Sequence, residues 1–405
     1  MLKSNASPDT LDKRNVTRLR VLEHIRVRGP ISRIDIAAAL QTSPATVTAA
    51  TANLISAGLI KEIEGDTNPK STKRGRPRVL LQLDGTSHLI AGLKVARQHI
   101  SVIVVDFEGS EVASHRHALD NARMSPDEFV KVIRAVLEDT CKKINSSPDK
   151  LAGVSIGIAG LVDAERNFVH WSSSITERNI DFNDLLSTEL PCPAFVENDA
   201  NLVAKAEQLF GLGKGLKNFL VVTIEHGVGL GIVLDGELYR GERGCGAEFG
   251  HAKVQLDGAL CQCGQRGCLE AYVGDYALIR EMTVADQTKD METVSDIQER
   301  ARSGDQRAVS VLARAGQMFG LGISNLINLF DPECIIISAA HSSIDHLCSD
   351  EVMNRIRSGV VNVDAALPEI KVHRWGDQIW AKGAAAYGIE QVSILKVKEF
   401  AANAP

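Results

Sequence analysis

The segment GERGCGAEFG-HAKVQLDGAL-CQCGQRGCLE, residues 241–270, carries the most specific pattern in the sequence. Four of the chain's eight cysteines lie in it; three of these, Cys261, Cys263 and Cys268, crowd near its end, and His251 precedes them. One imidazole and three thiolates at such short spacing are typical of a tetrahedral Zn²⁺ site with no open coordination position. A closed site of this kind is structural rather than catalytic. Reduced free thiols or a disulfide are the alternatives.

Charge separates a basic N-terminal part from an acidic remainder. Residues 1–80 hold 14 Lys and Arg against 7 Asp and Glu, so the remainder sums to −13 within a total of −6. This asymmetry predicts that only the first part meets a polyanion, although a solvated basic surface has the same composition. The length of 405 residues predicts two or three domains. The sequence has no apolar run of the roughly 18–20 residues that a membrane span needs and no signal-peptide core, which favours the cytoplasm and no membrane partner.

The N-terminal part predicts a helix-turn-helix. A first helix ends at Gly29-Pro30, and its apolar residues at helical spacing are Val16, Leu19, Leu22 and Ile25. Ser32 is the expected N-cap of a second helix, with Asp35 in the capping-box position. Ser43 is the expected N-cap of a third helix, from about residue 44 to 57. The residues that this third helix is expected to bury are Val47, Ala50 and Leu54.

The third helix and the hairpin after it predict contacts with both grooves of DNA. Small polar side chains on the outer face of the helix allow close approach to the major groove; the expected contacts are Ser43, Thr46, Thr48, Ala49 and Asn53. Strands at 59–63 and 79–83 flank a polar tip and form a wing. The tip residues expected to enter the minor groove of A·T-rich DNA are Arg74, Gly75, Arg76, Pro77 and Arg78. A protein-interaction module with a basic loop is the alternative, but the combination favours double-stranded DNA.

From residue 84 the pattern changes to strands that alternate with helices. An amphipathic helix is expected from about Pro126, and a helix-rich stretch spans 270–329. The residues expected on one face of the first of these helices are Phe129, Ile133, Val136 and Ile144. The expected strand regions are 89–95, 100–106, 154–158, 194–196, 219–234 and 335–337. This alternation predicts an α/β body, and the sequence has no internal repeat.

Three motifs in this body resemble the ROK family, a group of repressors and sugar kinases that share an actin-like (ribonuclease H-like) fold of two lobes. The motifs are Gly157-Ile158-Ala159-Gly160 with Val162-Asp163, then Glu197-Asn198-Asp199-Ala200-Asn201, and the segment 241–270. The resemblance covers essentially the whole chain, because many family repressors carry an N-terminal winged helix. It implies zinc ligation by His251, Cys261, Cys263 and Cys268. It also implies contacts to sugar hydroxyls by Gly160, Asn198, Asp199, Glu248, His251 and Glu270, with Asp199 at the position of the kinases' catalytic base.

The chain departs from the family's kinases at the motifs that bind phosphate. A first motif resembling Asp-x-Gly-Gly-Thr reads Lys94-Val95-Ala96-Arg97-Gln98 here. A second, Gly-Thr-Gly-x-Gly-Gly-Gly, reads Glu225-His226-Gly227-Val228-Gly229-Leu230-Gly231, and a late glycine pair reads Ser338-Ala339-Ala340. A carboxylate at Glu225 would repel phosphate oxygens, and side chains would block close backbone approach. We therefore expect no kinase activity. Relatives often carry Pro-Asn-Leu at a sugar contact where this chain has Ser173-Ser174-Ile175, so the identity of the sugar stays open.

The sequence thus predicts a sugar-responsive transcription regulator, expected to be a repressor. Its parts are a winged helix at 1–83, a first lobe at 84–200, and a second lobe at 201–405 whose final helix, about 381–395, returns to the first lobe. A sugar closing the cleft between the lobes would change the spacing of two winged helices on a palindromic operator, which requires a homodimer or homotetramer. The two rival interpretations are a sugar kinase with an added DNA-binding domain and a regulator controlled by a protein partner.

Overall fold

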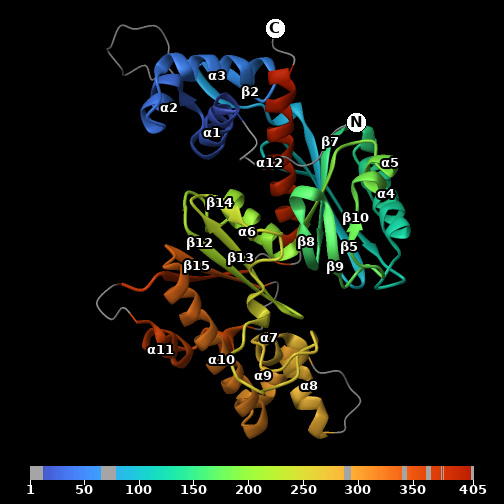
Figure 1. Cartoon of the computed structure of the whole chain (residues 1–405), viewed down its shortest axis with the longest axis vertical. Helices are drawn as coiled ribbons and strands as arrows, with labels where there is room; N and C mark the ends of the chain where they lie inside the picture. The colour runs from blue at the N-terminus through green and yellow to red at the C-terminus, as the bar shows by residue number, and fades with distance from the viewer. Residues whose placement is uncertain are drawn as a thin grey trace. The chain divides into compact units, whose positions relative to one another are not determined.

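A computed structural model describes residues 12–64, 79–286, 293–339, 344–361, 366–374, 376 and 378–402. These residues form two compact units, which Figure 1 shows together. Unit 1 comprises Met1–Leu202 and Trp380–Pro405, and unit 2 comprises Val203–Ile379. The predicted wing tip, with Arg74, Gly75, Arg76, Pro77 and Arg78, lies outside the described residues, as does Ala340.

Unit 1 begins with a winged helix-turn-helix, as predicted. Its helices are α1 (Lys13–Arg28), α2 (Arg33–Ala39) and α3 (Pro44–Ser56). Its strands are β1 (Ile31–Ser32), β2 (Ile60–Glu64) and β3 (Val79–Leu83), paired antiparallel in the order β1-β3-β2. The strands β2 and β3 therefore flank the segment predicted to form the tip of the wing.

Side-chain caps set the starts of α2 and α3 where the sequence predicts them. The Oγ atom of Ser32 accepts a hydrogen bond from the backbone N–H of Asp35 at 3.3 Å. The Oγ atom of Ser43 accepts one from the backbone N–H of Thr46 at 3.1 Å. Pro44 lies in the first turn of α3, where its missing N–H leaves no helical hydrogen bond unmade. The caps thereby fix the length of the turn between the two helices.

One residue predicted for the core of α1 lies on the wrong face. Leu22 and Ile25 are buried as expected, but Val16 is 37% exposed and Val21 is fully buried in its place. A step of three residues turns through about 300°, so the predicted face drifts by about 60° at each step. After three such steps Val16 lies on the side of the helix opposite Ile25, which explains the error.

The rest of unit 1 is built on a five-stranded sheet of order β11-β7-β4-β5-β6. Its strands are β4 (Leu89–Val95), β5 (His99–Asp106), β6 (Glu111–Ala118), β7 (Leu151–Ile158) and β11 (Ala194–Asn198). The strands β4, β5 and β6 form an antiparallel meander, whereas β7 is parallel to β4 and β11 is parallel to β7. The carboxyl ends of β4, β7 and β11 therefore meet at one edge of the sheet.

A small antiparallel sheet and four helices complete unit 1. The sheet consists of β8 (Gly160–Asp163), β9 (Phe168–Ser172) and β10 (Ile180–Asp181). The helices are α4 (Pro126–Lys142), α5 (Asn183–Glu189), α6 (Asp199–Phe210), which continues into unit 2, and α12 (Ile379–Ala402). Because α4 ends at Lys142, Ile144 lies just beyond the helix, but it packs against the same core as the predicted apolar face, as expected.

Unit 2 repeats the strand order of the five-stranded sheet in unit 1. Its strands are β12 (Phe219–Ile224), β13 (Val228–Leu234), β14 (Glu237–Tyr239), β15 (Cys334–Ala339) and β16 (Glu369–Arg374). The strands β12, β13 and β14 form an antiparallel meander, and β15 and β16 continue the sheet in parallel from β12. The helices are α7 (Glu270–Val273), α8 (Asp275–Asp286), α9 (Val294–Arg302), α10 (Gln306–Phe330) and α11 (Asp350–Gly359). Two α/β lobes of one strand order confirm the predicted actin-like fold.

Small residues bring α12 directly onto β4. A Cβ atom added at Gly92 would lie 2.2 Å from the backbone nitrogen of Ala385 and 2.3 Å from the carbonyl oxygen of Ala381. Both are backbone atoms, so they could move aside only if the whole helix shifted. Glycine at this position is therefore what allows α12 to pack on the sheet.

Replacing Gly92 with alanine is expected to destabilise the protein by about 1–3 kcal/mol, the usual cost of overpacking a core. Differential scanning calorimetry of the full chain measures this as a lower melting temperature. Gly320→Ala in α10 is the matched control, because an added Cβ there would meet only the side chain of Arg355, at 3.2 Å. Since alanine favours helix over glycine, this control should be neutral or stabilising. Equal effects of the two substitutions would contradict the account of the α12 packing.

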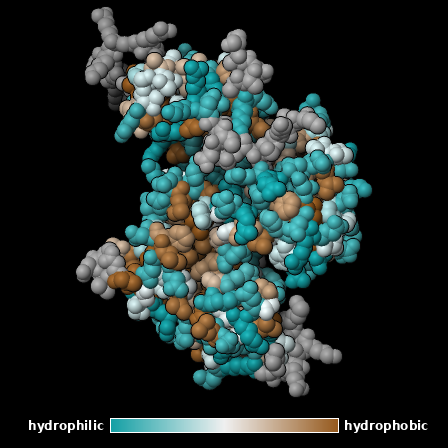
Figure 2. Space-filling view, viewed as in Figure 1, coloured by the Kyte–Doolittle hydropathy of each residue, from teal (hydrophilic) through white to brown (hydrophobic). Residues whose placement is uncertain are grey.

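Hydrophilic residues cover most of the face drawn in Figure 2, and apolar residues form separate patches on it. The most exposed large apolar side chains among the described residues include Leu256, Val361, Leu329 and Ile34. Within the described part of the chain, none of the helices combines the length and apolar character needed to cross a lipid bilayer.

Candidate functional site

Four side chains of unit 2 converge on a possible metal site. Their ligand atoms all lie within 4.8 Å of one another, and they belong to His251, Cys261, Cys263 and Cys268. Cys261 and Cys268 are buried, whereas Cys263 is exposed. The structure therefore brings together all four residues that the sequence predicts as ligands.

The spacing of these atoms fits a tetrahedral ion. The sulfurs of Cys263 and Cys268 are 3.8 Å apart, and the sulfur of Cys261 is 3.7 Å from Nδ1 of His251. Bonds of about 2.3 Å to sulfur and about 2.0–2.1 Å to nitrogen separate two sulfurs by about 3.8 Å and a sulfur from a nitrogen by about 3.6 Å. All eight cysteines have free thiols, which contradicts the disulfide alternative.

Two glycines make the tight loop that carries the cysteines. Gly264 and Gly267 both have positive φ angles, +86° and +77°. A Cβ atom at Gly267 would lie 1.7 Å from the carbonyl oxygen of Gln255, so no side chain fits there. The backbone N–H of Cys261 donates to the carbonyl oxygen of Gln265 at 2.8 Å and closes the loop. The turn thus holds the three thiols within reach of one ion.

A lysine that the sequence reasoning missed lies against this cluster. The Nζ atom of Lys253 donates to the sulfur of Cys268 at 2.9 Å and to Oε1 of Gln265 at 2.6 Å. The hydrogen bond to Cys268 raises the pKa of Lys253 above its usual range. With a divalent cation bound, three thiolates and the cation would carry a net charge of −1, which this ammonium would offset. An isolated lysine in a polar loop gives no sequence signal of such a role.

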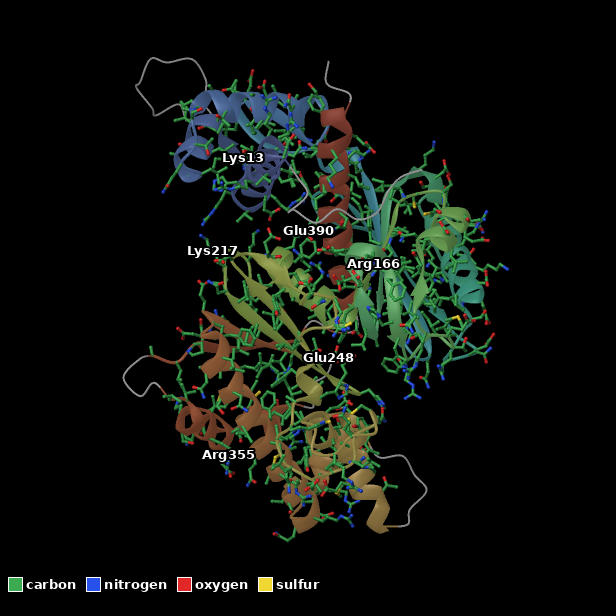
Figure 3. All side chains as sticks on the ribbon, in the orientation of Figure 1. Lys13, Arg166, Lys217, Glu248, Arg355 and Glu390 are labelled. Atoms are coloured by element: carbon green, nitrogen blue, oxygen red, sulfur yellow. The ribbon has the colours of Figure 1, made fainter. Side chains whose placement is uncertain are left out.

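The acidic residues expected to contact a sugar from unit 2 surround the same cluster. The Nε2 atom of His251 is 3.9 Å from Oε2 of Glu248, which is one of the residues labelled in Figure 3. Glu270 accepts the backbone N–H of Val228 at 3.3 Å and the hydroxyl of Tyr276 at 3.4 Å. Burial raises the pKa of that tyrosine above its usual range. The thiol of Cys261 also donates to Oε1 of Glu270 at 3.5 Å. The positions of Glu248 and Glu270 therefore depend on the conformation of this His–Cys cluster.

In unit 1, Asn198 joins two of the predicted motifs. Its Nδ2 atom donates to the carbonyl oxygen of Gly160 at 2.8 Å, and its Oδ1 atom accepts the backbone N–H of Ala200 at 2.9 Å. Asn198 thus caps the first turn of α6 and holds β8 beside it. Gly160 has φ +145°, and a Cβ atom there would lie 2.1 Å from the carbonyl oxygen of Trp171. These contacts order the edge at the carboxyl end of β11.

Asp199 begins α6 at this edge, and it forms an ion pair with Lys94 of β4. The side chains of Lys94 and Asp199 are 11% and 22% exposed, respectively. The ammonium also lies 5.9 Å from the centre of the Trp380 ring. The sequence showed that Lys94 replaces an acidic residue of the kinases, but only the fold shows that it meets the predicted catalytic position.

The two segments that the resemblance aligns with phosphate motifs lie in equivalent hairpins of the two lobes. Residues 96–98 connect β4 to β5, and residues 225–227 connect β12 to β13, the corresponding strands of unit 2. In the second hairpin, an added Cβ atom at Gly227 would lie 2.6 Å from Oε2 of Glu270. This hairpin therefore contacts a carboxylate of the protein. Ser174, at the predicted sugar contact, is buried, and its backbone N–H donates to Oγ of Ser172 at 3.1 Å.

The residues predicted to contact DNA lie on the outer face of α3 as far as the structure describes them. Ser43, Thr46, Thr48 and Ala49 are exposed and Asn53 is half-buried. With its amide oxygen turned toward Arg18, Asn53 accepts hydrogen bonds from Nη2 at 2.7 Å and from Nε at 3.1 Å. The guanidinium of Arg18 also lies 5.5 Å from the centre of the Phe400 ring at the end of α12. Arg18 therefore links α1, α3 and α12. Nothing in the sequence pattern predicts this role.

A second arginine of α1 anchors the winged helix to the first lobe. The Nη1 atom of Arg26 donates to the carbonyl oxygen of Phe107 at 2.8 Å, and the guanidinium lies 4.8 Å from the centre of that ring. Its side chain is only 6% exposed, and burial lowers its pKa. Phe107 follows β5 directly, so this contact joins the DNA-binding part to the main sheet of unit 1.

Comparisons with known proteins agree with this architecture. A model of the MarR family matches residues 15–70, and a model of the ROK family matches residues 90–390. The xylose repressor of Bacillus spizizenii is 28% identical over 360 residues, which cover 88% of this chain and 91% of that protein. The DNA-binding transcriptional dual regulator NagC of Escherichia coli is 29% identical over 328 residues, which cover 78% of each protein.

Solved structures agree as well. A ROK family transcriptional regulator, a homologue of the Escherichia coli MLC protein, matches with a TM-score of 0.80 and 27% identity, covering 95% of this chain and 99% of that one. A ROK family glucokinase from Streptomyces griseus, in complex with glucose and AMPPNP, matches with a TM-score of 0.62 and 29% identity, covering 74% of this chain and 99% of that one. Because the ROK family model matches well over half of its length, from residue 90 to residue 390, this chain belongs to the ROK family.

Proposed function

We propose that this chain is a DNA-binding transcriptional repressor whose kinase-like body binds a sugar as effector and does not phosphorylate it. The observation that carries the proposal is the union of a winged helix-turn-helix with a ROK body in one chain. The relatives named xylose repressor and N-acetylglucosamine repressor support a carbohydrate effector. The proposed DNA contacts are the exposed face of α3 and the arginines of the wing.

The proposed absence of kinase activity rests on the residues at the phosphate motifs. Phosphoryl transfer needs a free base at the sugar hydroxyl and a glycine-rich cradle for the triphosphate. Here Lys94 pairs with Asp199, and the hairpin at 225–227 begins with a carboxylate and lies against Glu270.

We propose that His251, Cys261, Cys263 and Cys268 hold a structural Zn²⁺. Their spacing, and a donor set of one imidazole and three thiols, support this assignment. With four protein ligands the ion has no open position, so it would brace the loop rather than polarise a ligand. The proposed sugar contacts Glu248 and Glu270 would depend on it for their positions.

We propose that the active form is a homodimer or homotetramer that places two winged helices on a palindromic, A·T-rich operator. Sugar binding would shift the population between two arrangements of these winged helices. The buried contact of Arg26 with Phe107 supports this coupling, because it ties α1 to the sheet whose edge carries Asp199. For this mechanism we retain the division into residues 1–83, 84–200 and 201–405.

A thermal-shift titration of the full chain against neutral sugars and Mg²⁺·ATP tests the proposal. A ligand that binds only the folded state raises the free energy of unfolding by about 2.7 kcal/mol when its concentration is a hundred times its Kd. The melting temperature rises as a consequence. We expect stabilisation by at least one sugar and none by Mg²⁺·ATP. A clear shift with Mg²⁺·ATP would contradict the non-kinase proposal, and silence with every sugar would favour control by a protein partner.

A further inference from the structure

The ion pair of Lys94 and Asp199 lies where the fold is expected to bind a ligand. Lys94 is the next-to-last residue of β4, and Asp199 follows β11 directly as the first residue of α6. The carboxyl ends of parallel strands are the usual ligand-binding edge of an α/β sheet. The pair is also adjacent to Asn198 and its contact with Gly160. The ion pair of Lys94 and Asp199 therefore lies at the same edge of the sheet as the motifs that resemble the ROK family.

The hydrogen-bonding capacity of this pair is only partly used. The ammonium of Lys94 has three N–H donors, and within the described residues its polar contact is Oδ2 of Asp199, with the Trp380 ring 5.9 Å away. The Oδ1 atom of Asp199 accepts the backbone N–H of Ala200 at 3.0 Å. The side chain of Lys94 is only 11% exposed, so it is largely sheltered from bulk water. A ligand oxygen at this position would give the remaining N–H donors of the ammonium an acceptor.

The charge of the pair determines which oxygen fits. The ammonium and the carboxylate neutralise each other, so the pair presents one donor and one acceptor without net charge. A sugar hydroxyl can accept from Lys94 and donate to Asp199 at the same time. A phosphate ester can accept from Lys94, but its negative oxygens would face the carboxylate of Asp199 at close range. The arrangement thus favours a neutral ligand.

We propose that Lys94 and Asp199 together bind the hydroxyl of the effector that is esterified in its phosphate ester, and so make the site select an unphosphorylated sugar over that ester. This inference rests on the proposed sugar-sensing function and names the chemical class of its ligand. Lys94 is then the specificity-determining residue of the regulator. The same lysine that removes the phosphate cradle of a kinase supplies a hydrogen bond to the sensed molecule.

Isothermal titration calorimetry of the full chain tests this with xylose, glucose, N-acetylglucosamine, glucose 6-phosphate and N-acetylglucosamine 6-phosphate. The wild-type chain should bind at least one neutral sugar, and a neutral hexose at least tenfold more tightly than its 6-phosphate. Lys94→Met should weaken the neutral sugar at least tenfold. Asp199→Asn leaves the ammonium of Lys94 without its counter-ion. The preference for the neutral hexose over its 6-phosphate, measured as the ratio of the two affinities, should therefore fall at least tenfold.

Controls separate this role from a structural one. Lys150→Met removes an exposed lysine, 72% accessible, and should leave every affinity unchanged. Lys94→Arg keeps the positive charge and should keep the preference for the neutral sugar. A merely structural role for the pair would lower both affinities together and would not change their ratio, and operator binding by each variant reports that the chain is folded.

The possible outcomes are distinguishable. A wild-type preference for the phosphate ester overturns the inference, as does an unchanged ratio in Asp199→Asn with a neutral sugar still bound. Either result would leave the proposed sugar-sensing function standing. Absence of binding by any of the five compounds to the wild-type chain would instead count against the sensing function itself, and the inference would fall with it.

Discussion

Replacing Cys268 with serine should abolish metal binding and lower the melting temperature of the protein by at least about 5 °C. Cys268 is completely buried beside Leu269 and α7, so loss of the proposed ion would disturb a position that packs in the hydrophobic core of unit 2. Metal-binding free energy is also folding free energy, and about 2–3 kcal/mol of it shifts a domain of this size by that amount. Metal content by plasma mass spectrometry and melting by calorimetry measure the two effects.

The matched control for this substitution is Cys245→Ser. Cys245 lies in the same part of unit 2 but is outside the ligand cluster, and its thiol is only partly buried. We expect one equivalent of zinc in the wild-type chain and in this control, and much less in Cys268→Ser. A Cys268→Ser protein that retains stoichiometric zinc, or a wild-type protein purified without it at neutral pH, would refute the metal assignment.

Replacing Arg74, Arg76 and Arg78 together with alanine should weaken operator binding by about 10²–10³. Each arginine that neutralises a phosphate releases about 0.9 counter-ion, so the slope of log K against log salt should become shallower by about 2–3. These arginines lie outside the described residues, and the expectation rests on the slim Arg-Gly-Arg-Pro sequence between β2 and β3. Fluorescence anisotropy with a labelled operator at several salt concentrations measures both quantities.

Removal of three cations from elsewhere in the chain controls for net charge. Arg134, Lys142 and Lys150 all have side chains at least half exposed in unit 1. Their triple alanine variant carries the same net charge as the wing variant and should bind the operator with nearly wild-type affinity. Equal losses in the two variants would show that bulk charge, and not the wing, determines binding.

Local rules predicted the elements of this fold well. Ser32 and Ser43 cap their helices because short polar side chains satisfy exposed N–H groups, a rule that needs no tertiary information. The strand at residues 89–95 is buried on both faces, and its sequence is apolar except for Lys94 near its end. The error at Val16 arose from a three-residue spacing, which follows a helix only over a short distance.

Contacts between residues far apart in the chain could not be predicted from the sequence, because they depend on the order of the strands in the folded sheet. Lys94 and Asp199 are 105 residues apart, and their contact follows from the order of three parallel strands. Likewise, the two lobes share one strand order without any repeat in sequence, because many side chains satisfy the same buried pattern. The ligand cluster was predictable since its three cysteines lie within one short loop. Lys253, Arg18 and Arg26 were not, because isolated cations leave no periodic signal.

The most direct test of the account is a selection of DNA by the full chain from a pool of randomised duplexes, followed by titration of the selected duplex with neutral sugars. The account predicts enrichment of a palindromic, A·T-rich sequence, and release of that duplex by at least one neutral sugar without consumption of ATP. Absence of any enriched sequence, or sugar-dependent hydrolysis of ATP by the same preparation, would contradict it.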